Sequence, residues 1–204
     1  MRADPSQIDE LIAQSRAGDS AALGRLLEQY RAYLALLARL QIGRRLQGKA
    51  DPSDVVQEAF LAAARGFPRF RGQTEGELLA WLRRVLATKL SSLVRRYAAR
   101  QRDVRREQDL VAELEETSRC LGGLVVAPGG SPSQEAARRE QAVLLADALE
   151  RLPEHYREEI VLHHMEGLTM TETAQRMGRT PAGVEKLWAR ALAWLRDETE
   201  EERP

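Results

Sequence analysis

The sequence predicts an all-α protein in which a flexible linker joins two helical domains, the second containing a helix-turn-helix. Three observations support this fold class. The 204 residues are rich in Leu, Ala, Arg and Glu, which favour helices, and β-branched residues are thinly spread. Apolar residues recur at helical spacing towards both ends of the chain. Between these regions, a stretch rich in Pro, Gly and Ser lacks that periodicity. We therefore expect domains over residues 1–97 and 141–204 and a linker over residues 98–140.

In the first domain, two antiparallel helices are expected at the N-terminus, separated by a break and an N-cap at residues 18–20. A further helix begins at Asp51, whose carboxylate can cap the first turn, and Pro52 suits the first helical position. This helix is expected to end where a loop over residues 67–76 begins. The loop leads into a long amphipathic helix over about residues 77–97.

The second domain is expected to be a compact group of four helices, in which residues 169–196 form a helix-turn-helix. Such a motif needs a small residue where its helices pack closely, and Ala174 meets this need. Gly178, four positions later, provides the turn residue that tolerates a positive φ. Val184 and Leu187 are spaced to face the first helix of the motif.

Composition and charge limit the classes of function. The 31 basic and 31 acidic residues cancel, which argues against a protein that simply coats nucleic acid. The charge is nevertheless uneven, because residues 83–106 are strongly basic and residues 197–202 form an acidic, solvated tail. The single cysteine, Cys120, excludes an intrachain disulfide and a cysteine-based metal site. A polar N-terminus and the lack of a long apolar run predict a cytoplasmic protein.

The helix-turn-helix is the strongest local signal for DNA binding, because such a unit projects the start of its second helix into the major groove. An ordinary helical hairpin is the alternative interpretation. The exposed candidates for DNA contacts in this motif are Arg179, Thr180, Pro181, Ala182, Glu185, Lys186 and Arg190.

A second signal is one face of the long helix, which combines an aromatic ring with cations. An indole interleaved with arginines suits stacking on bases beside a phosphate track. The alternative is a solvated basic face with the indole folded onto a neighbouring helix. The residues of this stripe are Trp81, Arg84, Thr88, Ser91 and Arg95.

The polar face of the helix that begins at Asp51 carries Asp54, Gln57 and Glu58. Paired carboxylates invite a catalytic interpretation, but no nucleophile or metal partner accompanies them. We expect an acidic protein-docking face, with a merely soluble helix face as the alternative. Residues 163–164, two histidines followed by Glu166, do not predict a metal site, because adjacent histidines point to different helix faces and further ligands are missing.

Three segments, in this order, are similar to the same family. They are residues 51–60, residues 70–85, and residues 149–160 together with the helix-turn-helix. On these segments the chain resembles the extracytoplasmic-function (ECF) group of the sigma-70 family, which are small bacterial promoter-specificity subunits. Each motif is moderately specific, whereas the ordered set of three is highly specific. The resemblance covers most of the chain outside the linker.

The resemblance implies a non-enzymatic subunit, without a cofactor, that directs core RNA polymerase to promoters. Core polymerase and promoter DNA are the implied partners, and an anti-sigma protein is a further candidate. Contacts are implied with the clamp coiled coil of the largest polymerase subunit and with the flap. We expect no membrane partner and a monomer when the protein is free. The implied core-binding residues are Asp51, Asp54, Gln57 and Glu58.

The resemblance also implies two DNA-binding sets. The loop over residues 67–76 places aromatic and arginine side chains beside glycines, so it could hold a base flipped from the opened strand. The implied residues for minus-ten recognition and strand opening are Phe67, Phe70, Arg71, Trp81, Arg84, Thr88 and Arg95. The implied residues for minus-thirty-five recognition are Arg179, Thr180, Glu185, Lys186 and Arg190.

The sequence departs from the family pattern at several DNA-facing places. Thr88 stands where Asn is usual and Ser92 where Asp is frequent, so minus-ten preference is expected to differ. In the second domain fewer phosphate contacts are expected, which predicts weak or unusual upstream binding. In that domain this chain has Glu185 where the family commonly has Lys, Leu187 and Leu192 where it commonly has Arg, and Trp188 where Leu is usual.

Two other functions stay open on the sequence. A one-component regulator would use only the helix-turn-helix, and would need a dimer interface and a sensor pocket but no contact with polymerase core. An enzyme or a helical scaffold, in which both basic surfaces are incidental, ranks last because no acid–base pair or activated nucleophile supports it.

Overall fold

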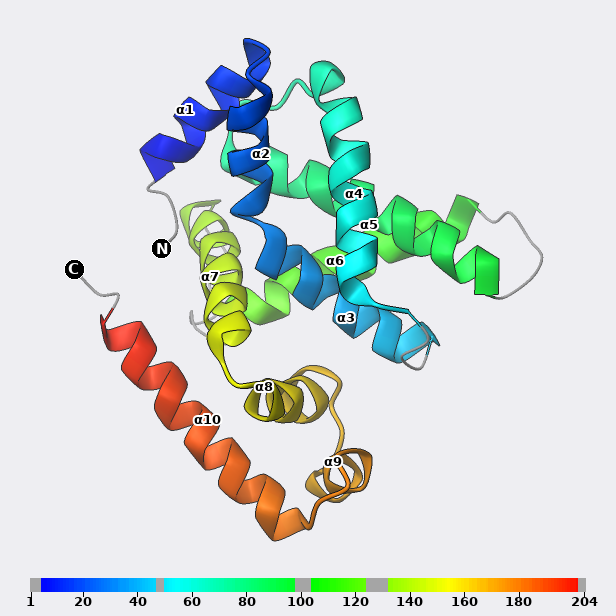
Figure 1. The fold of residues 1–204 in the computed structure, drawn as a ribbon, viewed down its shortest axis with the longest axis vertical. Helices are drawn as coiled ribbons and strands as arrows, with labels where there is room; N and C mark the ends of the chain where they lie inside the picture. The colour runs from blue at the N-terminus through cyan, green and yellow to red at the C-terminus, as the bar shows by residue number, and fades with distance from the viewer. Residues whose placement is uncertain (1–4, 47–49, 98–103, 124–131, 202–204) are drawn as a thin grey trace. The chain divides into compact units, whose positions relative to one another are not determined.

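The computed structural model describes residues 5–46, 50–97, 104–123 and 132–201, and these residues are helical or form short connections without any strand (Figure 1). The predicted all-α fold class is therefore confirmed for this part of the chain. The chain divides into two compact units, residues 1–144 and residues 145–204. Within the described ranges, no helix has the length and apolar character needed to cross a membrane.

Three helices lie where two were expected: α1 (Pro5–Arg16), α2 (Ser20–Glu28) and α3 (Arg31–Leu46). The expectation is wrong because the chain turns at Tyr30, between α2 and α3. The Tyr30 ring is fully buried, and its hydroxyl donates to a carboxylate oxygen of Glu75 at 3.0 Å. The turn thereby ties the beginning of α3 to the beginning of the long helix α5.

The predicted break before α2 is confirmed, and its chemistry is local. Gly18 has a φ of +96°, in the left-handed region that favours glycine. The Asp19 carboxylate accepts hydrogen bonds from the backbone nitrogens of Ala21 and Ala22 at 2.8 and 3.0 Å. These bonds satisfy N–H groups that a helix start leaves unpaired, and the bond from Ala22 is the main reason that the pKa of Asp19 is lowered.

The next elements form the frame of the first candidate site: α4 (Pro52–Gly66), the short 3-10 turn η1 (Phe67–Arg69) and α5 (Glu75–Tyr97). The predicted cap is confirmed, because the Asp51 carboxylate accepts from the Ser53 nitrogen at 2.8 Å and Pro52 opens α4. Helices α3, α4 and α5 pack on one another. The side of α4 turned towards them buries Val55, Val56, Ala59 and Ala63.

The first unit continues beyond residue 97. Helix α6 (Val104–Gly123) packs on α5 and α3 and buries Leu110 and Leu114. Helix α7 (Pro132–Arg151) spans the boundary between the two units. The segment expected as a linker thus contains helical structure wherever it is described. Its Pro/Gly-rich part, residues 124–131, lies outside the described residues, and the domain boundaries at 97 and 140 stay predictions.

The second unit contains the end of α7 and then α8 (Glu154–Ile160), the π-helical turn η2 (Val161–Met165), α9 (Met170–Arg176) and α10 (Pro181–Glu201). Helix α10 packs on both α8 and α9 (Figure 1). The connection between α9 and α10 uses Gly178, whose φ is +62°.

The packing predicted inside the helix-turn-helix is confirmed, since Ala174, Val184 and Leu187 are all buried. Thr169 and Glu172 form a reciprocal capping box at the start of α9.

Candidate nucleic-acid interface

The residues expected to dock on a protein lie on the outer face of α4 and at its N-cap, Asp51, and all of them are exposed. The Glu58 carboxylate lies 3.5 Å from the Arg96 guanidinium of α5, and both side chains remain about half exposed at 49% and 62%. Leu61, one helical turn further along α4, is 54% exposed. Sequence reasoning missed Leu61, although its position four residues after Gln57 places it on the same face.

The exposed stripe of α5 is narrower than the sequence predicted. Arg84 and Thr88 are exposed, and Arg95 is partly buried. The Arg95 guanidinium donates to the Ser92 hydroxyl oxygen at 2.9 Å, so the two polar groups are held together on this face. Ser91, however, is buried, and its placement on the stripe is wrong because it lies on the side of α5 that packs inward.

Three aromatic rings form a cluster at the junction of α4 and α5. The ring centroids of Phe70 and Trp81 are 5.0 Å apart, and the Phe67 centroid lies 5.6 Å from that of Phe70 and 6.0 Å from that of Trp81. Phe67 and Phe70 are buried and Trp81 is partly buried. The indole therefore packs on the connection between α4 and α5 rather than standing free beside Arg84, whereas the alternative interpretation had placed it on a neighbouring helix.

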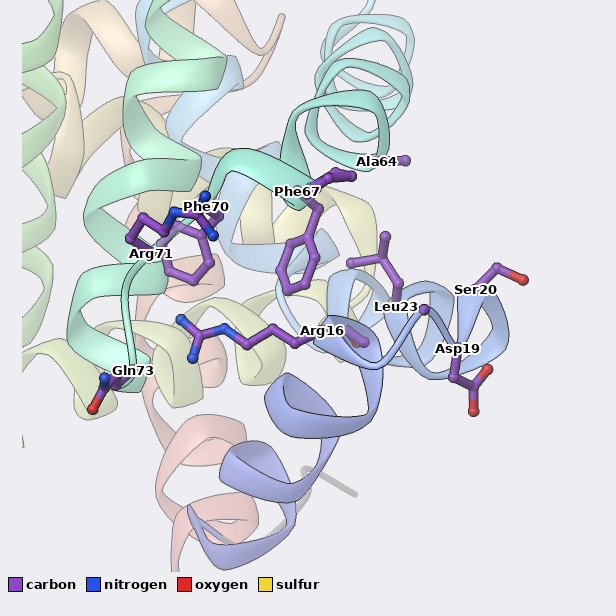
Figure 2. Close-up of a pocket in the computed structure, with 12 residues that line it drawn as sticks. Arg16, Asp19, Ser20, Leu23, Ala64, Phe67, Phe70, Arg71 and Gln73 are labelled. Carbon is purple, nitrogen blue, oxygen red and sulfur yellow. The ribbon is translucent and has the colours of Figure 1, made fainter.

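A hollow of about 560 Å³ lies beside this aromatic cluster (Figure 2). One wall comes from the connection between α4 and α5, the region in which a base-holding loop was predicted. The other wall comes from the end of α1 and the start of α2, and nothing in the local sequence indicated that it would be there. The lining residues are Ser15, Arg16, Gly18, Asp19, Ser20, Leu23, Ala64, Phe67, Pro68, Phe70, Arg71 and Gln73.

The start of the second helix of the helix-turn-helix is exposed as predicted, and so are all five residues expected to contact upstream DNA. One of them, Thr180, also has a structural task, because its hydroxyl oxygen accepts from the Gly183 nitrogen at 3.2 Å. Leu187 is buried, so its place cannot hold a phosphate contact in this protein, whereas Leu192 is 38% exposed.

Trp188, another departure from the family pattern, packs at the surface of the second unit. Its indole nitrogen donates to the His164 Nε2 at 2.6 Å, and the two rings stack with centroids 6.1 Å apart. The neighbouring His163 uses its Nδ1 in a 2.7 Å contact with the Leu168 carbonyl oxygen. The two imidazole rings also contact each other edge to face, with centroids 4.7 Å apart, while each makes its polar contact with a different residue. No group of three or more His, Cys, Asp or Glu residues suited to a metal occurs in the described chain.

The core of the second unit contains polar groups that sequence reasoning missed. Glu159 on α8 is fully buried, and its two carboxylate oxygens have no hydrogen-bond partner among the described residues. Burial raises its pKa to about 7, against a smaller opposite effect of the charge on His163. Thr173 on α9 is also fully buried, and no partner is found in the described ranges for its hydroxyl oxygen.

Comparison with known proteins identifies the family. The model described as "ECF sigma factor" matches residues 5–201. The ECF RNA polymerase sigma factor SigD of Mycobacterium tuberculosis is 30% identical over 192 residues, which cover 94% of this chain and 84% of that protein. The RNA polymerase sigma factor CnrH of Cupriavidus metallidurans is 31% identical over 193 residues, covering 94% of each.

Among solved structures, CnrH in complex with the cytosolic domain of CnrY aligns with 97% of this chain and 99% of that chain, at 26% identity and a TM-score of 0.37. The family match spans both units, including the α4 face, the hollow and the helix-turn-helix. This chain belongs to the ECF sigma factor family.

Proposed function

We propose that this protein binds core RNA polymerase through the exposed face of α4, opens the minus-ten element with α5 and the adjacent hollow, and reads the minus-thirty-five element with the helix-turn-helix. The observation that carries the proposal is the arrangement of two chemically opposite faces on packed helices of one unit. Asp54 and Glu58 are exposed on α4, and Arg84 is exposed on α5. A factor of this kind must hold a protein and DNA at the same time.

The α4 face has the composition of a protein-docking surface. Leu61 supplies an exposed apolar anchor, and Asp54, Gln57 and Glu58 supply a polar and acidic rim. Interfaces are commonly built from an apolar centre with a polar rim, and complementary charge increases the rate of encounter. A helical partner that combines basic and apolar side chains, such as the clamp coiled coil, fits this face.

The α5 face and the hollow together suit an opened strand. Arg84 and Arg95 can neutralise phosphates, and the hollow beside Phe67 and Phe70 falls within the range of about 300–1,000 Å³ that is common for small-ligand pockets. A flipped base can therefore be held against aromatic side chains. No nucleotide hydrolysis is needed, because binding the separated strand more tightly than the duplex shifts the equilibrium towards opening.

The upstream element is proposed to contact the exposed residues Arg179, Thr180, Glu185, Lys186 and Arg190. Since Leu187 is buried and Glu185 brings a negative charge into this group, the number of phosphate contacts is small. We infer that upstream binding alone is weak, and that promoter selection depends strongly on the minus-ten side.

The docking step is tested by Asp54→Arg, with Asp9→Arg as the matched control. Both residues are exposed in the first unit, and both substitutions change the charge equally. Affinity for purified core polymerase and run-off transcription from a promoter library are measured for each. Asp54→Arg is expected to weaken core binding by more than about tenfold and to reduce transcription in parallel, while Asp9→Arg retains both.

Wild-type-like core binding by Asp54→Arg would show that α4 is not the docking face. If the wild-type protein itself failed to bind core polymerase but bound duplex DNA, a one-component regulator would replace the sigma factor as the preferred function.

A further inference from the structure

Arg16, the last residue of α1, contacts a loop that lies far from it in the sequence. Its guanidinium donates a hydrogen bond to the carbonyl oxygen of Gly72, and the same group lies 6.0 Å from the centre of the Phe70 ring. Figure 2 shows the Arg16 side chain extending from the end of α1 towards Phe70. A guanidinium can serve both contacts, because its edge carries the donors while its charge is attracted to the face of an aromatic ring. Arg16 thus spans the hollow from the α1 wall to the loop wall.

The loop at Gly72 leaves no room for a side chain. A Cβ atom at this position would lie 2.3 Å from the Phe70 Cζ and 2.8 Å from the Glu77 Cβ. The backbone of Gly72 therefore rests directly on the Phe70 ring, which in turn packs on Trp81 at 5.0 Å. Because the Gly72 backbone and the Phe70 ring are in contact, a hydrogen bond that holds the Gly72 carbonyl in place also restricts the position of the Phe70 ring.

The loop is held from its other side by α5. A Glu77 carboxylate oxygen accepts from the backbone nitrogens of Gln73 and Thr74 at 2.7 and 3.1 Å. These bonds, the one from Gln73 first, lower the pKa of Glu77, and the positive charge of Arg16 adds a smaller effect in the same direction. The Glu77 bonds reach only residues three and four positions away in the chain, whereas Arg16 connects the loop to a different helix.

We propose that Arg16 is a positioning residue that sets the base specificity of the hollow. The inference rests on the proposed function, in which the hollow takes a base from the opened strand. Arg71 and Gln73 both line the hollow and flank Gly72 in the chain, so the position of the Gly72 carbonyl determines where their side chains start. Groups that discriminate between bases must be held in place to within a fraction of an ångström. The contacts that support these groups determine whether this precision is reached.

The experiment uses the full chain reconstituted with core polymerase and partly opened promoter templates. Each of the four bases is placed in turn at every minus-ten position of the displaced strand, and the relative affinity of the complex is measured. Wild type is expected to prefer one base at one position. Arg16→Ala is expected to reduce that preference by about tenfold, while core binding is unchanged and average affinity for the templates falls much less. Arg16→Lys, which keeps a donor but loses the planar group, is expected to recover only part of the preference.

The control is Arg25→Ala, which removes the same charge from an exposed position on α2 outside the lining of this hollow. Arg25→Ala is expected to keep the wild-type base preference. The comparison therefore separates the loss of one positive charge, which both variants share, from the loss of loop positioning, which only Arg16→Ala causes. A purely structural role of Arg16 would lower the affinity for all four bases alike.

If Arg16→Ala kept the full base preference, the positioning role would be overturned. If the wild-type protein showed no base preference at any position, the proposed capture of a base in the hollow would itself be wrong. This result differs from the one that rejects only the positioning role of Arg16, so the two hypotheses are tested separately. Should Arg16→Ala prove unstable by thermal melting, Gly72→Ala tests the same link, because it displaces the loop from Phe70 without altering α1. Retained preference in a folded Gly72→Ala variant would also contradict the proposal.

Discussion

The two units of this protein bury polar side chains in different ways. In the first unit, the buried Arg83 guanidinium donates to the Tyr33 hydroxyl oxygen at 3.1 Å, and that hydroxyl donates to Ser118 at 2.8 Å. The contacts join α5, α3 and α6, although the Arg83 Nε itself has no partner in the described residues. In the second unit, the buried oxygens of Glu159 and Thr173 have no such chain of partners in the described ranges.

This difference has consequences for stability and function. Polar groups that are connected inside a core rigidify it, whereas unpaired ones cost free energy. We therefore expect the first unit, which contains the hollow and the two proposed binding faces, to be the more rigid. Under the proposed function the second unit presents one helix end to duplex DNA, and we expect its core to be the less stable of the two.

Arg83→Ala is expected to destabilise the first unit by about 3–4 kcal/mol, because it leaves a cavity and removes the donor to Tyr33. Urea unfolding of the full chain, followed by hydrogen exchange of α3, α5 and α6 amides, measures the change. Exposed Arg84→Ala, the neighbouring residue, is the control and is expected to change stability by less than about 0.5 kcal/mol. Equal effects of the two substitutions would mean that the buried network contributes nothing particular to the first unit.

Glu159 makes the stability of the second unit depend on pH. Its folded pKa of about 7 lies above the ordinary value of 4.5, so the folded state keeps a proton that the unfolded state releases. The contribution of Glu159 to stability is therefore fully present below pH 4.5, is lost as pH rises from 4.5 through about 7, and does not change further above that. The total loss is about 3 kcal/mol.

Glu159→Leu is expected to remove this slope and to stabilise the second unit at pH 8 by a similar amount. Exchange of the α9 and α10 amides between pH 5 and 8 reports it, after correction for the intrinsic rates. Glu158→Leu, at the adjacent exposed position, should keep the wild-type slope. The explanation is wrong if Glu159→Leu leaves the slope unchanged.

Trp188→Phe removes the donor to His164 but keeps an aromatic ring in the stack, so a loss of about 1 kcal/mol is expected in the second unit. Exchange rates of the α10 amides provide the measurement. Trp194→Phe makes the same chemical change on the same helix and is expected to be closer to neutral. Indistinguishable rates for Trp188→Phe and wild type would indicate that this surface bond contributes no stability.

Glu185→Lys should have the smallest effect, and it acts on binding rather than on folding. It places a cation among Arg179, Lys186 and Arg190, so duplex binding is expected to tighten severalfold at low salt and the slope of log affinity against log salt to steepen by about 1. Titration of duplex DNA at several salt concentrations measures both quantities. If Glu150→Lys on α7 tightened duplex binding equally, the gain in affinity would come from the net charge alone and not from the position of residue 185.

Features that depend on neighbouring residues could be predicted from the sequence. The caps at Asp19 and Asp51 and the turn at Gly178 all act within four residues, so their chemistry is visible in a short segment. The exposed acidic face of α4 could be predicted for the same reason, because helical periodicity separates it from the apolar side of that helix.

Features that depend on distant residues could not be predicted in this way. The Tyr30 turn is coupled to Glu75, and Arg16 reaches Gly72 across 56 positions. Trp81 was expected on a polar face because the helix period places it there, but two rings from the preceding loop cover it. The burial of Glu159 follows from packing of the second unit, and no pattern of spacing distinguishes it from its exposed neighbour Glu158.

If one unit carries separate faces for polymerase and for opened DNA, a substitution on one face should leave the other step intact, and measuring core binding and strand opening in the same samples shows whether it does. A fluorescent base analogue in the minus-ten element reports opening, and a labelled protein reports binding to core. For Arg84→Ala, we expect opening to fall by about tenfold or more while core affinity stays at the wild-type value. If Arg84→Ala reduced core affinity as strongly as it reduced opening, the two faces would not be separate.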